Sequence, residues 1–196
     1  VPLMKSKKFF LKKDPMDESL PLIPREFEDG FGIQEAIDDV WNAWSKGQRS
    51  ETIFKASSKV NELLPIKKAR EKVRKFYGSS MQFLVPARRV LPGIVMFCRR
   101  YWRESECMVG INPTSSEWAQ FKEYLTEYTS ENMIAGDFSS FDTCMAQQVT
   151  TGVAKIIVDL YQRAGCSKED LTLLEGCLSD ICNPNVLFMG DLYNFA

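Results

Sequence analysis

Residues 136–142 read Gly136-Asp137-Phe138-Ser139-Ser140-Phe141-Asp142, and this short segment carries the strongest signal for chemistry and architecture. The stretch from Glu131 to Asp137 is apolar in its middle, at residues 133–135, and predicts a buried strand that ends at an aspartate. A turn of small residues follows, and a second aspartate stands just before a predicted helix. Because a buried carboxylate is costly unless its charge is compensated, Asp137 is a candidate ligand for a divalent cation.

The same spacing also fits a purely structural interpretation. Asp142 can cap the helix that follows it, and Asp137 can accept hydrogen bonds from the amides of the turn. Spacing by itself leaves both interpretations open.

A second set of residues is strongly basic and lies upstream. Residues 72–77 alternate charged and apolar side chains, which predicts a strand with Lys72 and Arg74 on one face. Such a face can bind a triphosphate, with arginine giving forked contacts and lysine a point charge. The alternative is a solvated basic hairpin. The basic side chains of this set are Lys55, Lys59, Lys67, Lys68, Arg70, Lys72, Arg74 and Lys75.

Charge is segregated along the 196 residues, although the net charge is only −1. Residues 46–103 hold fifteen basic and three acidic side chains, or +12, and residues 104–196 hold four basic and fourteen acidic ones, or −10. The basic part is expected to attract a polyanionic partner, and the acidic part is expected to attract cations. The alternative is that the two parts form solvated faces of opposite sign that attract each other.

Several classes of site are excluded by what the sequence lacks. There is no histidine, so histidine general bases and Cys/His zinc sites are absent. The six cysteines form no Cys-x-x-Cys pair, and we expect reduced thiols. Neither a P-loop nor a Gly-x-Gly-x-x-Gly motif occurs, and no apolar run approaches the length of a membrane span.

Hydrophobic periodicity predicts a mixture of helices and short strands, and therefore an α+β fold. A helix over residues 31–46 would use Trp41 and Trp44 as core anchors and end at Gly47. Further helices are expected at 88–103, from Ser115 or Ser116 as a cap through Tyr128, at 143–163 and at 168–180 with Ser167 as N-cap. The strands are expected at 52–54, 72–77 and 131–137, and a hairpin at 186–195.

Taken in order, these motifs resemble those of the RNA-dependent RNA polymerases of picorna-like positive-strand RNA viruses. The likeness covers about residues 50–196. The matching segments are Phe54–Lys59 and Lys72–Phe76 (motif F of the fingers), Leu91–Trp102 (the helix after it), Val109-Gly110-Ile111-Asn112-Pro113 with Trp118 (the link toward the palm), Asp137–Asp142 (palm motif A) and Leu192–Ala196 (the strand ahead of motif B).

The resemblance implies a role for each matching residue in two-metal nucleotidyl transfer. Asp137 would hold both catalytic Mg²⁺ or Mn²⁺ ions, with the carbonyl of Phe138 nearby, and Asp142 would sense the ribose 2′-hydroxyl. Arg74, Lys72 and Lys59 would grip the triphosphate. Hard oxygen ligands suit Mg²⁺, and a carboxylate at the sugar edge suits recognition of ribose.

The resemblance also implies a right-hand polymerase fragment, made of fingers and the first part of the palm. Residues 1–30 would be an extended segment, 31–130 the fingers, and 131–196 the start of the palm. The sequence ends before the Ser/Gly loop of motif B and the Gly-Asp-Asp of motif C, so we expect an internal piece that is inactive alone. Lys59 is followed by Val60-Asn61-Glu62, where the family commonly has Asp-Glu.

The partners implied are RNA template and primer, ribonucleoside triphosphates, and the remaining palm and thumb of the same polyprotein. Replication would take place in the host cytoplasm, in viral replication complexes, without a membrane segment in this chain. Two other functions stay open. One is a non-catalytic RNA-binding fragment, and the other is a reverse transcriptase, although those enzymes tend to place an aromatic side chain where it blocks the 2′-hydroxyl, whereas Asp142 fits the use of ribonucleotides.

Overall fold

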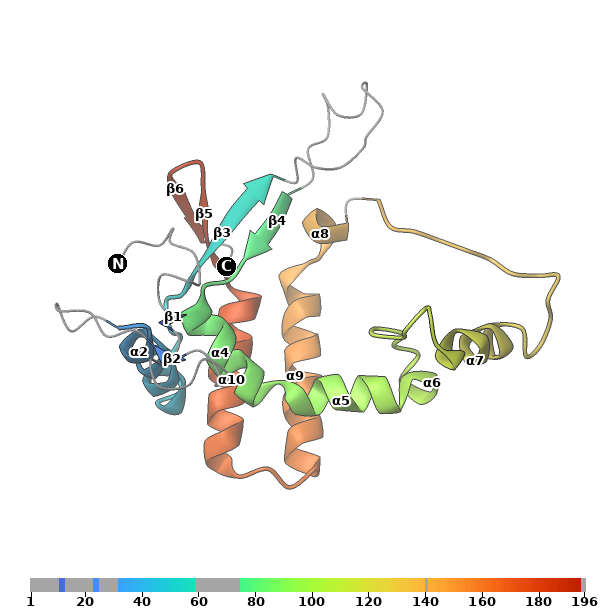
Figure 1. The fold of residues 1–196 in the computed structure, drawn as a ribbon, viewed down its shortest axis with the longest axis horizontal. Helices are drawn as coiled ribbons and strands as arrows, with labels where there is room; N and C mark the ends of the chain where they lie inside the picture. The colour runs from blue at the N-terminus through green and yellow to red at the C-terminus, as the bar shows by residue number, and fades with distance from the viewer. Residues whose placement is uncertain (1–10, 13–22, 25–31, 59–74, 140, 195–196) are drawn as a thin grey trace. The chain divides into compact units, whose positions relative to one another are not determined.

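The computed structural model describes residues 11–12, 23–24, 32–58, 75–139 and 141–194 (Figure 1). The chain divides into two compact units, one formed by Val1–Val90 with Thr151–Ala196 and the other by Leu91–Thr150. Strands and helices fall in separate runs along the chain, with helices in succession from Met81 to Cys182 between the strands Lys75–Gly78 and Asn185–Phe188, so the predicted α+β class is confirmed. The assignment to fingers and palm stays a prediction.

The core of the first unit lies among three helices, α2 (Ile33–Ser45), α4 (Met81–Val90) and α10 (Lys168–Cys182). Trp44 of α2 is fully buried, and its ring meets that of Phe83 edge-on at 5.5 Å between centroids. Gly176 of α10 lies against the same tryptophan, since a Cβ there would come within 2.8 Å of Trp44 Cδ1. The missing side chain therefore lets α2 and α10 approach closely.

A four-stranded sheet completes this unit, in the order β4-β3-β5-β6 (Figure 1). The strands are β3 (Ile53–Ser58), β4 (Lys75–Gly78), β5 (Asn185–Phe188) and β6 (Asp191–Asn194). β3 pairs antiparallel with β4 and parallel with β5, and β5 pairs antiparallel with β6. On the face toward the helices, Phe54 packs edge-on against Phe83, with 5.1 Å between ring centroids, and Val186 is buried. A separate two-stranded pair joins β1 (Leu11–Lys12) to β2 (Ile23–Pro24).

The second unit consists of short helices. They are α5 (Pro92–Arg100), α6 (Trp102–Ser105), α7 (Ser116–Leu125) and α8 (Phe141–Cys144). Its contacts are largely aromatic, because the Trp102 ring lies 6.4 Å from that of Phe121 and 5.6 Å from that of Tyr124. α9 (Gln147–Arg163) begins at the end of this unit and continues in the first, where the Tyr161 hydroxyl donates to the Val90 carbonyl at 3.0 Å.

Most of the predicted helices and the hairpin are confirmed. Ser115 caps α7 by accepting from the Glu117 N–H at 3.2 Å, and Ser167 caps α10 by accepting from the Asp170 N–H at 3.1 Å. The β5–β6 hairpin turns through Met189 and Gly190, whose φ angles are 53° and 99°. A two-residue hairpin turn with positive φ at both of its residues has a backbone twist that matches the right-handed twist of the two strands it joins.

Three predicted boundaries differ. The helix expected at 88–103 is divided among α4, α5 and α6, since Leu91-Pro92 and Tyr101 interrupt it. The helix expected to reach Tyr128 ends at Leu125, and the one expected from residue 143 begins at Gln147. Of the strand expected at 72–77, residues 75–77 lie in β4, and residues 72–74 lie outside the described residues.

Within the described residues, no single helix has both the length and the apolar composition needed to cross a membrane. The consecutive helices α4 and α5 meet both requirements only as a pair, and the pair is bent by 57°.

Candidate functional site

The segment around Asp137 does not form the predicted buried strand. Residues 132–138 belong to no strand or helix, Asp137 is exposed, and the side chain of Ile134 is 99% exposed. A strand needs a partner for its N–H and C=O groups, and no described strand pairs with this segment. The prediction of a buried motif A strand is therefore wrong for this structure, and the burial argument for a metal at Asp137 no longer applies.

The residues after Asp137 differ from the prediction, because Asp142 lies inside the short helix α8 instead of just before a helix that begins at residue 143. Phe138 is 79% exposed, and its ring lies 5.7 Å from that of Phe141, the first residue of α8. The backbone of Asp142 lies in α8, and its side chain is outside the described part of the structure. The oxygens that can meet a cation here are the exposed Asp137 carboxylate and the Phe138 carbonyl, which are hard donors of the kind Mg²⁺ takes.

The basic strand is only partly described. Lys59, Lys72 and Arg74, the three residues expected to bind phosphate, lie outside the described residues. Lys55 is described: it is exposed on β3, opposite Gly78 of β4 and next to Leu187 of β5. The sequence interpretation counted Lys55 in the basic set but gave it no role of its own.

Lys75 points away from Lys55. The register pairs Lys55 with Gly78, and alternate residues of a strand face opposite sides, so Lys75 shares its face with Tyr77. Its ammonium lies 4.1 Å from the centroid of the Phe188 ring, a cation–π contact within the sheet. Of these two lysines, Lys55 is therefore the one on the sheet face away from Phe54 and the helices.

The segment Val109–Pro113 forms a compact turn ahead of α7. The Asn112 N–H donates to Glu117 Oε2 at 2.9 Å, and Asn112 Oδ1 accepts from the Thr114 N–H at 3.0 Å. Gly110 has a φ of 92°, and a Cβ there would lie 2.9 Å from Arg99 Nε. A cavity of about 440 Å³ lies between this turn and the α5–α6 end, lined in part by Arg99, Trp102 and Ser116.

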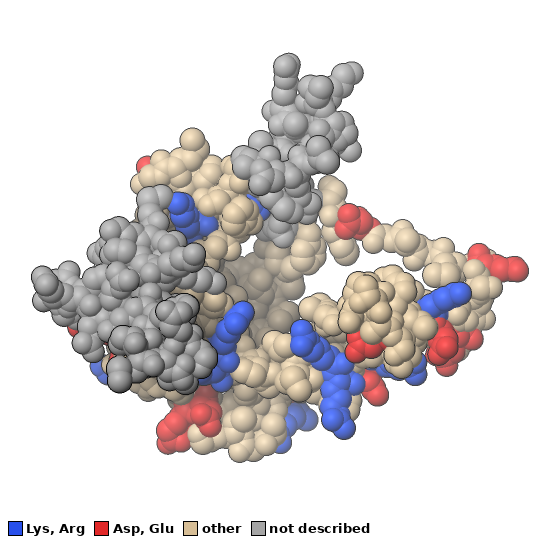
Figure 2. Space-filling view, viewed as in Figure 1, with Lys and Arg blue, Asp and Glu red and all other residues tan. Residues whose placement is uncertain are grey.

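Within the described residues of the second unit, the segregation of charge along the sequence does not produce a surface of single sign. On the face shown in Figure 2, basic and acidic side chains both occur over the second unit. Basic arginines of α5 and α6 (Arg99, Arg100 and Arg103) and acidic residues of α7 (Glu117 and Glu123) belong to that same unit.

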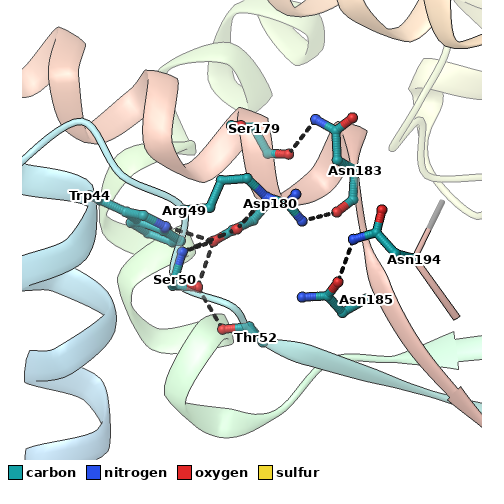
Figure 3. A network of polar contacts seen from close by, with 9 residues as sticks. All are labelled: Trp44, Arg49, Ser50, Thr52, Ser179, Asp180, Asn183, Asn185 and Asn194. Carbon is teal, nitrogen blue, oxygen red and sulfur yellow. Dashed lines mark hydrogen bonds and ion pairs between the residues drawn. The ribbon is translucent and has the colours of Figure 1, made fainter. Parts of the chain in front are cut away.

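Sequence reasoning missed a buried network of polar contacts around Asp180. Asp180 of α10 is 2% exposed and accepts from Trp44 Nε1 at 2.8 Å, from the Ser50 N–H at 3.1 Å and from Ser50 Oγ at 2.5 Å (Figure 3). Arg49 Nε lies 3.5 Å from its other oxygen, and the Arg49 guanidinium also donates to the Asn183 carbonyl. The signal was present, because Asp180 falls on the same helical face as the buried Leu173 and Cys177.

Among the described residues, no group of three or more His, Cys, Asp or Glu side chains is placed to hold a metal ion.

Comparison with known proteins identifies relatives over most of the chain. The model of a family described as viral RNA-dependent RNA polymerase matches residues 25–193. The RNA1 polyprotein of Cowpea mosaic virus (strain SB) is 31% identical over 112 residues, which is 56% of this chain and 6% of the polyprotein. The RNA1 polyprotein of Grapevine chrome mosaic virus is 29% identical over 109 residues, or 55% of this chain and 5% of the polyprotein.

A third relative is the RNA1 polyprotein of Broad bean wilt virus 1, which is 25% identical over 122 residues and 61% of this chain. The chain thus spans only 5% to 7% of the length of these polyproteins. No solved structure matches it.

Proposed function

Because this chain belongs to the viral RNA-dependent RNA polymerase family, we propose that it is part of an enzyme that synthesises RNA on an RNA template from ribonucleoside triphosphates. The family match over residues 25–193 carries the proposal. It includes both the basic strand and the Asp137–Asp142 segment, in the order that the polymerase motifs require.

In the proposed enzyme, Asp137 is the metal-binding residue of motif A, with the Phe138 carbonyl beside it. The exposed carboxylate of Asp137 supports this role, because it is accessible to a cation together with ligands from outside the described residues. Bound Mg²⁺ or Mn²⁺ would neutralise charge that develops on the phosphate oxygens during transfer. Asp142, on the first turn of α8, would contact the sugar edge of the incoming nucleotide.

The triphosphate would be held by basic residues of the β3–β4 region. Lys59, Lys72 and Arg74 keep the roles proposed for them, and Lys55 extends the set, because it is exposed on β3. Remaining parts of the palm and the thumb would come from the same polyprotein, RNA template and primer would be the macromolecular partners, and the work would be done in replication complexes of the host cytoplasm.

The test uses the longer polymerase protein that contains this chain, with Asp137→Ala compared with the wild type. Loss of one metal ligand should lower nucleotide incorporation about a thousandfold, or about 4 kcal/mol of transition-state stabilisation, while RNA affinity changes little. The matched control is Asp159→Ala, because Asp159 is an exposed carboxylate whose described ion pair is with Arg163 on its own helix. Undiminished incorporation by Asp137→Ala would refute the site, and equal loss of RNA binding would favour a binding role instead.

A further inference from the structure

Two cysteines that lie nine positions apart meet in the second unit. Cys98 is in the last turn of α5, and Cys107 follows α6. Between them Glu106 adopts a left-handed conformation, with φ 53° and ψ 21°, which turns the chain back after α6. The Cys98 and Cys107 thiols are hydrogen-bonded to each other, and both residues are half-buried, so small solutes reach them.

Contacts around the pair hold the returning segment against the end of α5. Gly110 lies so close to Arg99, the neighbour of Cys98, that a Cβ at Gly110 would come within 2.9 Å of Arg99 Nε. On the other side, the Tyr124 hydroxyl of α7 donates to Glu106 Oε1 at 3.3 Å. The thiol contact is therefore supported by packing on both sides of Cys107.

We propose that Cys98 and Cys107 are a site of reversible oxidation, at which a peroxide converts the two thiols into an intrachain disulfide. The inference does not depend on the polymerase function. Sulfurs that already share a hydrogen bond need little side-chain movement to reach the bond length of about 2.05 Å.

The reaction proceeds in two balanced steps. In the first, the Cys107 sulfur attacks one peroxide oxygen, an S–O bond forms as the O–O bond breaks, and water leaves with the thiol proton. In the second, the Cys98 sulfur attacks the sulfenic sulfur of Cys107, the S–S bond forms as the S–O bond breaks, and a second water leaves. The two thiols lose two hydrogens, and one hydrogen peroxide is reduced to two waters.

The surroundings of the two sulfurs set this order. Burial, and then the hydrogen bond that the Cys98 thiol donates to Cys107, raise the pKa of the Cys98 thiol, so its nucleophilic thiolate form is scarce and it is the second sulfur to attack. The disulfide would tie the Val109–Pro113 turn to the end of α5, and a thiol reductant would release it. By contrast Cys177 is buried in the first unit and has no thiol partner among the described contacts.

Trypsin gives a sharp readout of the bond. Arg99, Arg100 and Arg103 lie between the two cysteines, so digestion places Cys98 in peptide 90–99 and Cys107 in peptide 104–122, with one cysteine in each. The folded full chain, and the longer polymerase protein that contains it, are treated with hydrogen peroxide, alkylated and digested. The linked pair of these two peptides should be about tenfold more abundant than any other linked pair, and dithiothreitol should remove it.

Controls separate native proximity from random pairing. Cys98→Ser and Cys107→Ser should each abolish the link, while Cys166→Ser, at another half-buried cysteine, should leave it unchanged. In urea the preference should disappear, and Cys177 and Cys182, which are closer in sequence, should link at least as readily, seen as a disulfide within the single peptide 169–196. A link that is absent, or no more abundant in the folded chain than in urea, would overturn the proposal.

A second measurement needs no variant. Phenylarsine oxide bridges two adjacent thiols, so the wild-type protein should take up one arsenical on peptides 90–99 and 104–122 together, and prior oxidation with peroxide should block this uptake. Arsenical found on other cysteines, or on none, would count against a paired site at Cys98 and Cys107.

Discussion

Trp44 and Asp180 are joined by a buried hydrogen bond of 2.8 Å from the indole Nε1 to the carboxylate Oδ2, although they lie 136 positions apart in the sequence. The bond connects α2 to α10, and the same carboxylate holds the backbone of Ser50, just before β3. A buried carboxylate needs compensation, and here three donors from α2 and the Ser50 segment, with Arg49 nearby, provide it. Asp180 therefore ties two helices to the start of the sheet.

Asp180→Ala should lower the free energy of unfolding by about 3 kcal/mol, because it leaves Trp44 Nε1 and the Ser50 N–H without their buried acceptor. Urea denaturation followed by tryptophan fluorescence measures the change. Asp159→Ala removes a carboxylate from an exposed ion pair and should cost no more than about 0.5 kcal/mol. If the two variants lowered the free energy of unfolding equally, the buried network around Asp180 would stabilise the protein no more than an exposed ion pair does.

Gly176→Ala should destabilise the protein by about 1–3 kcal/mol, although alanine is the better helix former. The new methyl group would lie 2.8–2.9 Å from the side chain and Cα of Trp44, so the two helices would have to separate. Gly152→Ala is the matched control in α9, where nothing lies within 4 Å of the new Cβ, and it should stabilise by about 0.5–1 kcal/mol. Thermal unfolding of both variants tests the contrast, which a gain in stability at Gly176 would contradict.

Cys177 should make the protein less stable as the pH rises above about 9. Burial, and then the negative charge of Asp180, raise the pKa of this thiol from 9.0 to about 12 in the folded state. Between these values the unfolded chain loses the thiol proton while the folded chain keeps it. The stability present below pH 9 should therefore fall by about 1.4 kcal/mol per pH unit from this group.

The measurement is the slope of unfolding free energy against pH between 9 and 11, in the wild type and in Cys177→Ala. The variant lacks this thiol, so other groups that titrate in the same range cancel when the two slopes are compared. Slow alkylation of Cys177 in the folded protein should accompany the effect. Identical slopes would mean that the thiol ionises equally in both states.

Asp142→Ala should narrow the preference of the longer polymerase protein for ribonucleotides over deoxyribonucleotides, by about tenfold or more. The reason is the proposed contact between this carboxylate, at the first turn of α8, and the ribose 2′-hydroxyl. The ratio of incorporation efficiencies for the two sugars is the readout, with Asp159→Ala as the control. An unchanged ratio would remove Asp142 from sugar recognition.

Local signals in the sequence predicted much of the first unit correctly. The apolar spacing of α2 put Trp44 in the core, Ser167 marked the start of α10, and the apolar residues of 186–195 predicted the hairpin of β5 and β6. Each of these features depends on residues within a few positions of one another, so periodicity and capping chemistry are sufficient to find them.

The errors arose where a local pattern needed a distant partner. The segment before Asp137 has the composition of a buried strand, yet no described strand pairs with it, and its side chains are exposed. The rule that a buried carboxylate must be compensated was sound, but it applied to Asp180, whose donors lie about 130 positions away.

The sequence by itself determined the family, the α+β class, the helix faces and the caps, because each is written in the order and spacing of residues along the chain. Only the tertiary structure decided that β3 runs parallel to β5, that Lys55 and Lys75 lie on opposite faces of the sheet, and that Asp180 meets Trp44. Those relationships depend on which distant segments pair, and the hydrophobic pattern of a strand or helix specifies a buried face without naming the segment that covers it.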